Sequence, residues 1–412
     1  MINTFLYIDP GTGSMLFSIF IGAAATLFFL GKAAWIKVKL LFSTKKKGIT
    51  STDSNYKPYV IYNEGMQYWN TFKPICDEFE KRNIELTYYT SAEHDPCFEQ
   101  NYKYVKPEFI GEGNIAFVKL NMLSAGIVLM TTPGLHVYQL KRSKNVKHYS
   151  HILHAPSDAT LYRLFGLDYF DSVLLSGEHQ IPDIRFLEKE RDIKEKELVV
   201  VGCPYLDTLK EKLSKIPQEE NHTFTVLVSP SWGPSALLSK YGEKLLDPLI
   251  ETGWNIIIRP HPQSKKSENE MLTRLTDKYK DCKNLTWDFE RDNIYSMKKS
   301  DFMISDFSGI IFDYTFLCEK PVMYVNAEMD LMPYDAYDLP DHGKHIWTYE
   351  ILSKIGIELK EEQFKNIKSV ITNASDSKEL QTIRQETKAQ AWMNEGNAGK
   401  AVVDFMISKQ KV

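Results

Sequence analysis

The sequence predicts an α/β protein in which two domains, each built on a parallel β-sheet, face a cleft and follow one membrane-spanning helix. Three observations lead to this prediction. Short apolar, β-branched runs alternate with longer segments of helical periodicity, an order that is typical of parallel sheets. The alternation stops in a charged stretch at residues 210–222 and then resumes. The first fifty residues instead hold a long uncharged stretch followed by lysines.

The uncharged stretch runs from Pro10 to Gly31, and we expect a transmembrane helix at about residues 11–31 within an anchor segment of residues 1–50. As a helix this stretch spans roughly 33 Å, which is enough to cross a bilayer. Lysines follow it and none precedes it, so the positive-inside rule places the rest of the chain in the cytoplasm. A cleaved signal peptide and a re-entrant or interfacial helix are the alternatives.

The first predicted domain spans residues 58–209. Its clearest helical periodicity lies at 66–81. Its expected strands are apolar runs that end in turn-forming residues, at 59–62, 84–89, 125–132, 146–153, 171–177 and 198–204. Because strands alternate with helices, we expect them to pair in parallel.

The second predicted domain spans residues 222–412 and includes the terminal helices. Its strands are expected at 224–228, 254–258, 285–287, 302–304 and 321–325. Its helices are expected at 237–251, 268–279, 294–298, 310–317 and 379–407. Two similar halves joined by one linker imply a cleft between them, where sites usually form.

Composition argues against several classes of function. A net charge of −4 argues against a nucleic-acid binder. The five cysteines form no C-x-x-C pair and no carboxylate cluster is present, so we expect neither a metal site nor a disulfide framework. The Gly-rich phosphate loops of NTPases, kinases and dehydrogenases are absent from the sequence as well.

One strand end of the second domain carries a cation and an imidazole. The run 254–258 is followed by Arg259, and then by His261 between two prolines that end the strand. Open α/β sheets bind ligands at the carboxyl ends of their strands, so both side chains are predicted to face the cleft. Arg259 is a fork donor suited to phosphate. The alternatives are a surface ion pair for Arg259 and a loop cap for His261.

A second strand end supplies Ser305, Asp306, Ser308 and Gly309, immediately before the expected helix 310–317. That helix is apolar on nearly all sides and is therefore buried, and the N–H groups at a buried helix start need a partner. Small residues at a helix N-terminus form a ready anion site, so we predict that this loop binds a ligand phosphate. The alternative is that Ser and Asp only cap the helix.

The strand at 146–153 in the first domain ends at His154. A histidine at a strand end that faces the cleft can act as a general base near neutral pH, whereas the alternative is a structural histidine. His151 lies in mid-strand and is interpreted as structural. The segment 202–207 ends the last strand of this half, and we interpret it as architecture near the hinge.

Taken together, these motifs resemble the CDP-glycerol glycerophosphotransferases, which build wall teichoic acids and related surface polymers. That family has a basic residue before Pro-His-Pro, to which 259–262 correspond. It also has Ser/Thr-Asp-Tyr-Ser-Ser-x-x-Phe-Asp before a Lys/Arg-Pro, to which 305–313 and 320–321 are similar. The segment 202–207 resembles its Gly-x-Pro-Arg-x-Asp, and the likeness covers roughly residues 146–330.

The chain also departs from the family. Tyr205 stands where the family has Arg, and Phe307 and Gly309 stand where it has Tyr and the second Ser. After the first-domain histidine the family commonly has Gly-Thr-Pro-Leu-Lys, whereas this chain has Ala-Pro-Ser-Asp at 155–158.

The resemblance implies a GT-B architecture, in which two Rossmann-like domains face each other and the C-terminal one binds most of the donor. By resemblance His154 and His261 are the catalytic histidines, and Ser305, Asp306, Ser308 and Gly309 form the donor phosphate loop. His154 is then expected to take the proton of the acceptor hydroxyl, while His261 and Arg259 steady the transferring phosphate.

The resemblance implies a bacterial transferase, and the uncharged N-terminal stretch adds the expectation of a single-pass membrane anchor with the catalytic part in the cytoplasm. This anchor is a further departure from the family, whose teichoic-acid polymerases are usually peripheral. The transferase is expected to move glycerol phosphate, or a related polyol phosphate, from CDP-glycerol or a similar nucleotide donor to a lipid-linked saccharide or polymer acceptor, without a cofactor. Two alternatives stay open because fold does not fix chemistry. One is a GT-B glycosyltransferase or sugar-nucleotide epimerase that uses a UDP-sugar, and the other is a non-catalytic membrane protein of polymer assembly.

Overall fold

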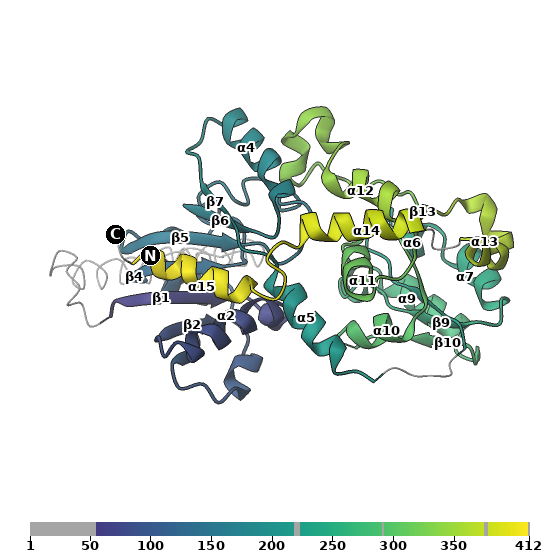
Figure 1. Cartoon of the computed structure of the whole chain (residues 1–412), viewed down its shortest axis with the longest axis horizontal. Helices are drawn as coiled ribbons and strands as arrows, with labels where there is room; N and C mark the ends of the chain where they lie inside the picture. Colours follow the sequence, from purple (N-terminus) through teal and green to yellow (C-terminus); the bar gives the residue numbers. More distant parts are fainter. Residues whose placement is uncertain (1–54, 218–222, 291, 375–377, 411–412) are drawn as a thin grey trace, which may run out of the picture. The chain divides into compact units, whose positions relative to one another are not determined.

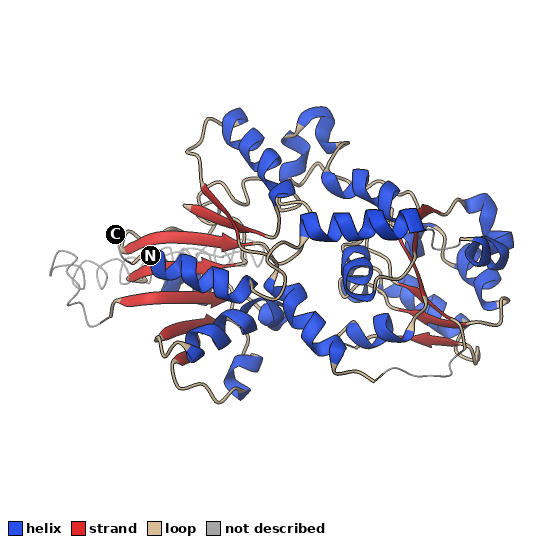
Figure 2. Cartoon of the chain, in the orientation of Figure 1, coloured by secondary structure: helices blue, strands red, loops and turns tan. Residues whose placement is uncertain are grey.

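Two parallel sheets organise the computed structural model of this chain, which describes residues 55–217, 223–290, 292–374 and 378–410 (Figures 1 and 2). The α/β class with two parallel sheets is therefore confirmed. The predicted anchor, residues 1–50, lies outside the described residues. In the part of the chain that is described, no helix has both the length and the apolar character needed to cross a membrane.

The first sheet has seven parallel strands in the order β3-β2-β1-β4-β5-β6-β7. These are β1 (Lys57–Asn63), β2 (Leu86–Thr90), β3 (Val105–Phe109), β4 (Ala125–Met130), β5 (Val146–Ile152), β6 (Ser172–Leu175) and β7 (Glu197–Val200). The sequence analysis missed β3. Pro107 and its charged neighbours hide the strand, which pairs on one side only, where a proline is tolerated.

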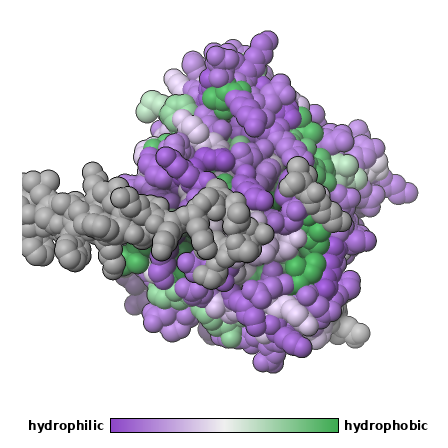
Figure 3. Space-filling view, turned by 90° about the vertical axis from the view of Figure 1, so that its left-hand side faces the viewer, coloured by the Kyte–Doolittle hydropathy of each residue, from purple (hydrophilic) through white to green (hydrophobic). Residues whose placement is uncertain are grey.

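Helices cover both faces of the first sheet. On one face lie α2 (Trp69–Lys81) and α15 (Ala398–Ser408), and on the other lie α3 (Asn114–Asn121) and α4 (Ile181–Glu190). Successive strand residues serve opposite faces, so that Ile61 packs with α2 and α15 while Val60 packs with α3 and α4. The outer surface drawn in Figure 3 is mainly hydrophilic, with smaller hydrophobic areas between.

The second sheet has six parallel strands in the order β10-β9-β8-β11-β12-β13. These are β8 (Thr225–Val228), β9 (Asn255–Ile258), β10 (Leu285–Trp287), β11 (Phe302–Ser305), β12 (Val322–Tyr324) and β13 (Ile357–Glu358). In both sheets the fourth strand pairs on the far side of the first, which creates a topological switch point. Ligands of open α/β sheets bind at such points.

Helices cover both faces of the second sheet too. One face packs against α7 (Glu243–Ile250), α9 (Asn269–Lys278) and α13 (Ile367–Asn373). The other packs against α5 (Pro204–Ser214), α10 (Ile294–Lys299), α11 (Ile310–Cys318), α12 (Trp347–Ile355) and α14 (Lys378–Ala391). The helix α5 also contacts α2, so it touches both halves, and it occupies part of the stretch 210–222 that the sequence suggested as a linker.

The terminal helix expected at 379–407 is two helices, because Asn394 and Gly396 adopt positive φ angles between them. The helix α14 lies against α11 and α12, whereas α15 packs against α2 (Figure 1). The sequence analysis placed both with the second domain. Instead α15 belongs to the first sheet, because Val402, Val403 and Met406 fill the core beside α2.

A long stretch after β12, residues 326–346, contacts the first half, and we call it the bridging segment. Its Asp335 N–H donates to the carbonyl of Tyr162 at 2.8 Å. Arg191, at the end of α4, pairs with Asp168 of its own half at 2.8 Å and with Asp335 and Asp338 of the bridging segment at 2.7 Å each. These contacts hold the bridging segment against the first half.

Candidate functional site

Two of the sequence-predicted loops meet at one edge of the second sheet. His261 follows β9, and the loop 305–309 follows β11. Between these strands lies β8, whose end continues into Ser229 and Ser231. Because all three strands are parallel and adjacent, their carboxyl ends place both loops beside the switch point between β8 and β11.

Ser305 and Asp306 are fully buried and support the loops. The Ser305 hydroxyl donates to the carbonyl of Ser229 at 2.5 Å. The Asp306 carboxylate accepts from the N–H groups of Ser231 and Leu237 at 2.8 Å each and of Ser308 at 3.1 Å. Burial raises the pKa of Asp306 to about 6 despite these bonds. Both side chains therefore tie the loop after β8 to the loop after β11, a supporting role that the sequence did not indicate.

Ser308 and Gly309 stand at the start of α11, the position that the sequence predicted for a phosphate. Among the described residues, neither the Ser308 hydroxyl nor the N–H groups of Gly309 and Ile310 have a hydrogen-bond partner. Gly309 is exposed and in helical conformation, with φ −58°, and no atom lies within 4 Å of the place where a Cβ would stand. This geometry can accept an anion at the helix N-terminus.

His261 is half-buried, and a backbone contact determines the tautomer of its neutral ring. The N–H of Gln263 donates to Nδ1 of His261 at 3.1 Å, so a neutral ring must carry its hydrogen on Nε2. Burial lowers the pKa of His261, and the nearby carboxylate of Glu268 acts in the opposite direction. At neutral pH the ring can therefore donate one hydrogen bond to a phosphate oxygen.

Arg259 is engaged in holding a neighbouring loop. Its guanidinium pairs with Asp288 at 2.6 Å and donates to the carbonyl of Glu290 at 2.8 Å, both beyond the end of β10. The carboxylate of Asp288 also accepts from the hydroxyl of Ser296. Arg259 thus forms an ion pair, which is the alternative to a phosphate contact that the sequence left open. A contact between Arg259 and a phosphate stays a prediction. In the described part of the chain, no group of three or more His, Cys, Asp or Glu side chains could hold a metal ion.

His154 follows β5 in the first half and is half-buried. Its Nδ1 lies 3.2 Å from the hydroxyl of Tyr162, which in turn lies 3.2 Å from Nε2 of His151. The ring of Tyr68 meets the His154 ring edge-on, with centroids 5.0 Å apart. Burial lowers the pKa of His154 to about 4, so the imidazole is uncharged at neutral pH and has a lone pair for a proton.

The loop after His154, where the chain departs from the family, contacts the second half. The carboxylate of Asp158 accepts from the N–H of Thr348 at 3.0 Å and from its hydroxyl, and so caps α12. The ring of Trp347 lies 4.3 Å from that of His179, whose Nε2 lies 2.9 Å from the carbonyl of Pro156. The altered sequence at 155–158 therefore has a structural role in this chain.

The segment 202–207 joins helices of both halves. Tyr205 donates to the carboxylate of Asp313 in α11 at 2.8 Å. Asp207 accepts from the indole of Trp392 at 2.9 Å and from the N–H of Ala398 at 3.1 Å, at the start of α15. Asp207 has the architectural role that the sequence indicated, and the hydroxyl of Tyr205 serves as a hydrogen-bond donor to the buried Asp313.

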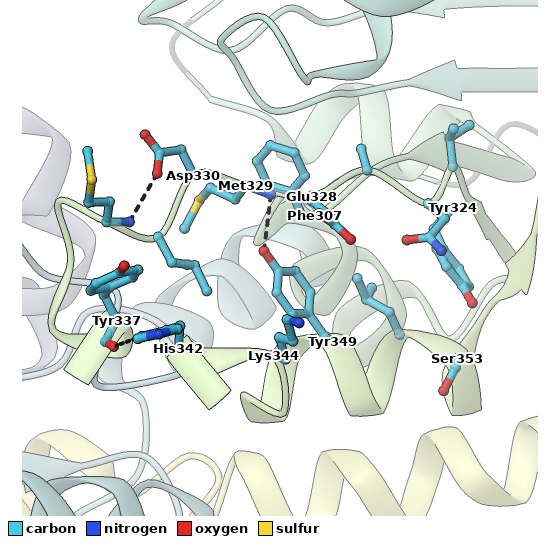
Figure 4. A pocket seen from close by; sticks show the side chains of 16 residues that line it. Phe307, Tyr324, Glu328, Met329, Asp330, Tyr337, His342, Lys344, Tyr349 and Ser353 are labelled. Carbon is cyan, nitrogen blue, oxygen red and sulfur yellow. Dashed lines mark hydrogen bonds between the residues drawn. The ribbon is translucent and has the colours of Figure 1, made fainter. Parts of the chain in front are cut away.

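A cavity of about 520 Å³ adjoins the loop 305–309 (Figure 4). Phe307 lines it together with Tyr324, part of the bridging segment and α12. Tyr349 is one of the lining residues, and its hydroxyl accepts a hydrogen bond from the N–H of Met329 at 3.2 Å (Figure 4). Sequence reasoning missed the cavity because the bridging segment carries no recognisable motif.

A family model and several solved structures match this chain. A family model described as CDP-Glycerol:Poly(glycerophosphate) glycerophosphotransferase matches residues 169–404. No curated protein matches the sequence. That family match includes His261 and the loop 305–309 but not His154.

Solved structures resemble the chain over most of its length. The structure of the wall teichoic acid polymerase TagF is 16% identical, with 88% of this chain and 91% of that chain covered and a TM-score of 0.55. A putative UDP-N-acetylglucosamine 2-epimerase from Listeria monocytogenes is 13% identical, with 86% and 97% covered and a TM-score of 0.56. The UDP-GlcNAc 2-epimerase from Neisseria meningitidis is 13% identical, with 85% and 100% covered and a TM-score of 0.53. At these identities the likeness shows the fold, which is the predicted GT-B fold.

Proposed function

The chain belongs to the CDP-glycerol:poly(glycerophosphate) glycerophosphotransferase family and is a glycerophosphotransferase, and on that premise we propose its substrates, its mechanism and its place in the cell. The donor is CDP-glycerol or a closely related CDP-polyol. The acceptor is a lipid-linked saccharide or polymer at the bacterial cell membrane. The observation that carries this proposal is the family match, because fold likeness to TagF and to the epimerases is equally strong.

In the proposed reaction, the donor diphosphate lies at the start of α11. The N–H groups of Gly309 and Ile310 and the hydroxyl of Ser308 bind its oxygens, and the Nε2–H of His261 donates to the phosphate that is transferred. Arg259, whose charge is paired with that of Asp288, orients the loop after β10 beside that phosphate. These donors stabilise the charge that develops as the phosphate is transferred.

The acceptor hydroxyl loses its proton to Nε2 of His154. The acceptor oxygen then bonds to the phosphorus that carries glycerol, and the bond from that phosphorus to CMP breaks. His154 is uncharged at neutral pH because burial lowers its pKa to about 4. A negatively charged diphosphate nearby raises the pKa of an imidazole, which makes His154 a stronger base when the donor is bound.

The proposed location is the cytoplasmic side of the membrane, with residues 11–31 as a single-pass anchor. Support comes from the uncharged stretch and the lysines after it. The proposal predicts that the full chain stays with membranes in 1 M salt, since salt screens only the basic contribution. Release of the protein by salt alone would show that this stretch does not span the bilayer.

The test of the substrate uses the full chain in membranes with three labelled donors, CDP-glycerol, CDP-ribitol and a UDP-sugar. We expect transfer of label to a lipid-extractable or polymeric product from a CDP-polyol, together with CMP release. Turnover or epimerisation of the UDP-sugar with no reaction of either CDP-polyol would overturn the proposal. Normal polymer synthesis in cells that carry alanine at both His154 and His261 would instead support a non-catalytic role in assembly.

A further inference from the structure

The helix α3 carries apolar side chains on both of its sides. The inner side packs Ala116 and Leu120 into the core of the first sheet. The outer side carries Ile115, Val118 and the capping residue Met122, which are 67%, 53% and 51% exposed. These three are spaced three and four residues apart, so they form one stripe along the helix. A helix on a protein surface normally has a polar outer side, and this stripe therefore indicates a partner.

The loop that returns from β4 to β5 lies beside the end of α3 and adds positive charge. The side-chain amide of Asn121 donates to the carbonyl of Gln139 at 3.0 Å and accepts from the N–H of Lys141 at 2.7 Å. Tyr138, Lys141 and Lys144 of this loop are exposed. The exposed residues of the helix and the loop together are called the α3 face, which consists of Ile115, Val118, Met122, Tyr138, Lys141 and Lys144.

The chain enters the first sheet next to this face. The N–H of Lys57, the first residue of β1, donates at 2.9 Å to the carbonyl of Ser124, two residues past the end of the stripe. The N–H of Ala125 donates to the carbonyl of Asn145, in the basic loop, at 3.1 Å. Residues 1–54 precede this point and include the uncharged stretch and the lysines that we propose as an anchor. A membrane-associated segment there is covalently joined to the sheet edge at which α3 ends.

We propose that the α3 face lies on the membrane surface, with its apolar side chains between the lipid headgroups and its lysines at anionic phosphates. A short apolar stripe flanked by basic residues binds a bilayer in this way when a second signal already holds the protein there. A second copy of the chain packed on the same face would bring like charges together. The inference rests on the proposed membrane location, and it adds the face of the folded first half that contacts the lipid.

The two ends of α3 differ in charge, which predicts a tilt. Glu112 precedes the helix and is exposed, and the carboxylate of Glu108 lies 3.9 Å from Nζ of Lys119. Anionic lipid repels acids and attracts the lysines at the other end. The end of α3 at Met122 should therefore lie deeper in the bilayer surface than Ile115.

This orientation brings a cavity of the first half close to the membrane. The cavity, of about 480 Å³, adjoins the start of α3 and is lined in part by Glu112, Phe117 and the segment 64–67. Tyr68 is the next residue along the chain, and its ring meets that of His154 with centroids 5.0 Å apart. The α3 face thus runs from the point where the chain enters the sheet towards the candidate site, so a lipid-linked acceptor can approach that site while its lipid stays in the bilayer.

The test places a lipid-sensitive probe on the α3 face of the full chain. Val118→Cys carries a fluorophore, and Cys282→Ser with Cys318→Ser removes the two native thiols that are not buried. The protein is reconstituted in vesicles of phosphatidylcholine with phosphatidylglycerol that contain spin-labelled acyl chains as quenchers. Phe98→Cys is the matched control, because Phe98 is 41% exposed in the same half and its neighbour Cys97 packs on the α2 face. Quenching at Val118→Cys should exceed that at Phe98→Cys by about threefold or more.

Further variants test the depth and the charge of the contact. A probe at Met122→Cys should be quenched at least as strongly as one at Val118→Cys, and a probe at Ile115→Cys less strongly. Lys141→Gln together with Lys144→Gln should reduce quenching in the anionic vesicles to its level in pure phosphatidylcholine, because the lysines supply the preference for anionic lipid.

Transferase activity supplies the second readout. Val118→Asp should lower the rate with a lipid-linked acceptor in vesicles by about 3- to 10-fold, because an acid on this face is repelled by anionic lipid. The rate with a water-soluble acceptor analogue should not change, which separates the effect from a folding defect. Phe98→Asp should leave both rates unchanged.

Equal quenching at Val118→Cys and Phe98→Cys would overturn the inference. An efficient disulfide between two copies of Val118→Cys in detergent would also overturn it, since a second copy would then cover the face. If high salt fails to release the chain but both probes are quenched equally, the anchor stands and the α3 face is wrong. If salt releases the chain but Val118→Cys is still quenched on anionic vesicles at low salt, the face stands without the anchor. Quenching needs neither donor nor acceptor, so a lack of glycerol phosphate transfer would contradict the proposed function alone.

Discussion

The two halves share one strand order over their first six strands, yet burial acts on different titratable groups at the strand ends where the site is proposed. In the first half it lowers the pKa of His154, which follows β5, to about 4. In the second half it raises the pKa of Asp306, which follows β11, to about 6 and lowers the pKa of His261, which follows β9. The topology therefore fixes where a site can form, while the desolvated groups decide its chemistry: an uncharged imidazole in the first half, and in the second an imidazole beside an acid that turns inward and leaves backbone N–H groups for a ligand.

The sharpest way to break this comparison is to remove the base. His154→Ala should lower kcat by about 10²–10⁴-fold and leave donor Kd within twofold, because the proposed donor site lies in the other half. His261→Ala should impair both kcat and donor binding, because its Nε2–H is proposed to contact the phosphate before and during transfer. Product formation and donor titration measure these effects, with His345→Ala, whose side chain is 71% exposed, as control. If His154→Ala keeps kcat within twofold of wild type, the base has been assigned to the wrong residue.

A fall in pH should change the free energy of unfolding of the two halves in opposite directions. The pKa values of His151 and His154, about 3 and 4, lie below the unfolded value near 6.5. The unfolded chain then binds more protons between these limits, so the first half loses stability as pH falls through this window. Asp306 and Asp313 have the opposite sign: folded pKa values of about 6 and 7 exceed the unfolded value near 3.9, so the second half gains stability as pH falls toward 4.

Hydrogen exchange followed by mass spectrometry at pH 7 and pH 5 measures this difference. We expect the free energy of opening the first sheet to fall by on the order of 1–3 kcal/mol relative to that of the second sheet. A shift of one pKa unit corresponds to about 1.4 kcal/mol for each group, and the expected range is set below the sum because solvent screens these charges. Asp183 in α4 offsets part of the effect, because burial and neighbouring acids raise its pKa to about 6. Burial also raises the pKa of Asp158 in the first half and lowers that of His261 in the second half, and both shifts act in the same offsetting direction. Earlier opening of the second sheet at pH 5 would contradict the assignment of these groups.

Substitution of two serines in the loop 305–309 should affect donor binding and protein stability separately. Ser308→Ala removes a hydroxyl of the proposed phosphate site, and the free energy of donor binding should weaken by about 1.5–3 kcal/mol, the value of a hydrogen bond to a charged group. Its thermal stability should not change. Ser305→Ala leaves the carbonyl of Ser229 without its partner, so stability should fall by about 1–2 kcal/mol while donor affinity holds. Titration and thermal unfolding of both variants check this, and an equal effect of both on donor affinity would speak against the distinction.

The smallest effect is expected for Gly309→Ser, which restores the serine of the family. The backbone there has helical φ, and nothing lies within 4 Å of the new Cβ. Thermal stability should change by about 0.5 kcal/mol or less, and donor affinity should stay within threefold. A loss of more than tenfold in affinity would mean that the ligand approaches the backbone at this position more closely than the empty loop indicates.

The fold could be predicted well from the sequence because its central strands are fully buried. Runs such as Ala125–Met130 are apolar on both faces, and such strands occur in parallel sheets covered by helices. The edge strand β3 was missed since its residues are mostly exposed and include Pro107. The position of α15 was missed as well, because a helical pattern shows which face is apolar but not which sheet it covers.

The sequence could predict only those residues of the candidate site that directly follow a strand. His154, His261 and Ser308 stand where apolar runs stop, and the structure places each at a carboxyl edge. The roles of Ser305 and Asp306 could not be read from the sequence, because their partners at 229–237 come about seventy residues earlier. Tyr162 gave no signal at all, since its contact with His154 depends on how the loop after β5 folds back.

The packing of α15 has a consequence for how this protein folds during translation. Val402, Val403, Phe405 and Met406 complete the core of the sheet whose last strand ends at Val200. At about 5–20 residues per second, the nascent first half waits roughly 10–40 s for that helix, with one apolar face incomplete. The part of the chain that is translated first is therefore the last to finish folding. During that interval it is the natural client of a chaperone, and a stalled or truncated translation product would expose the earlier half rather than the later one.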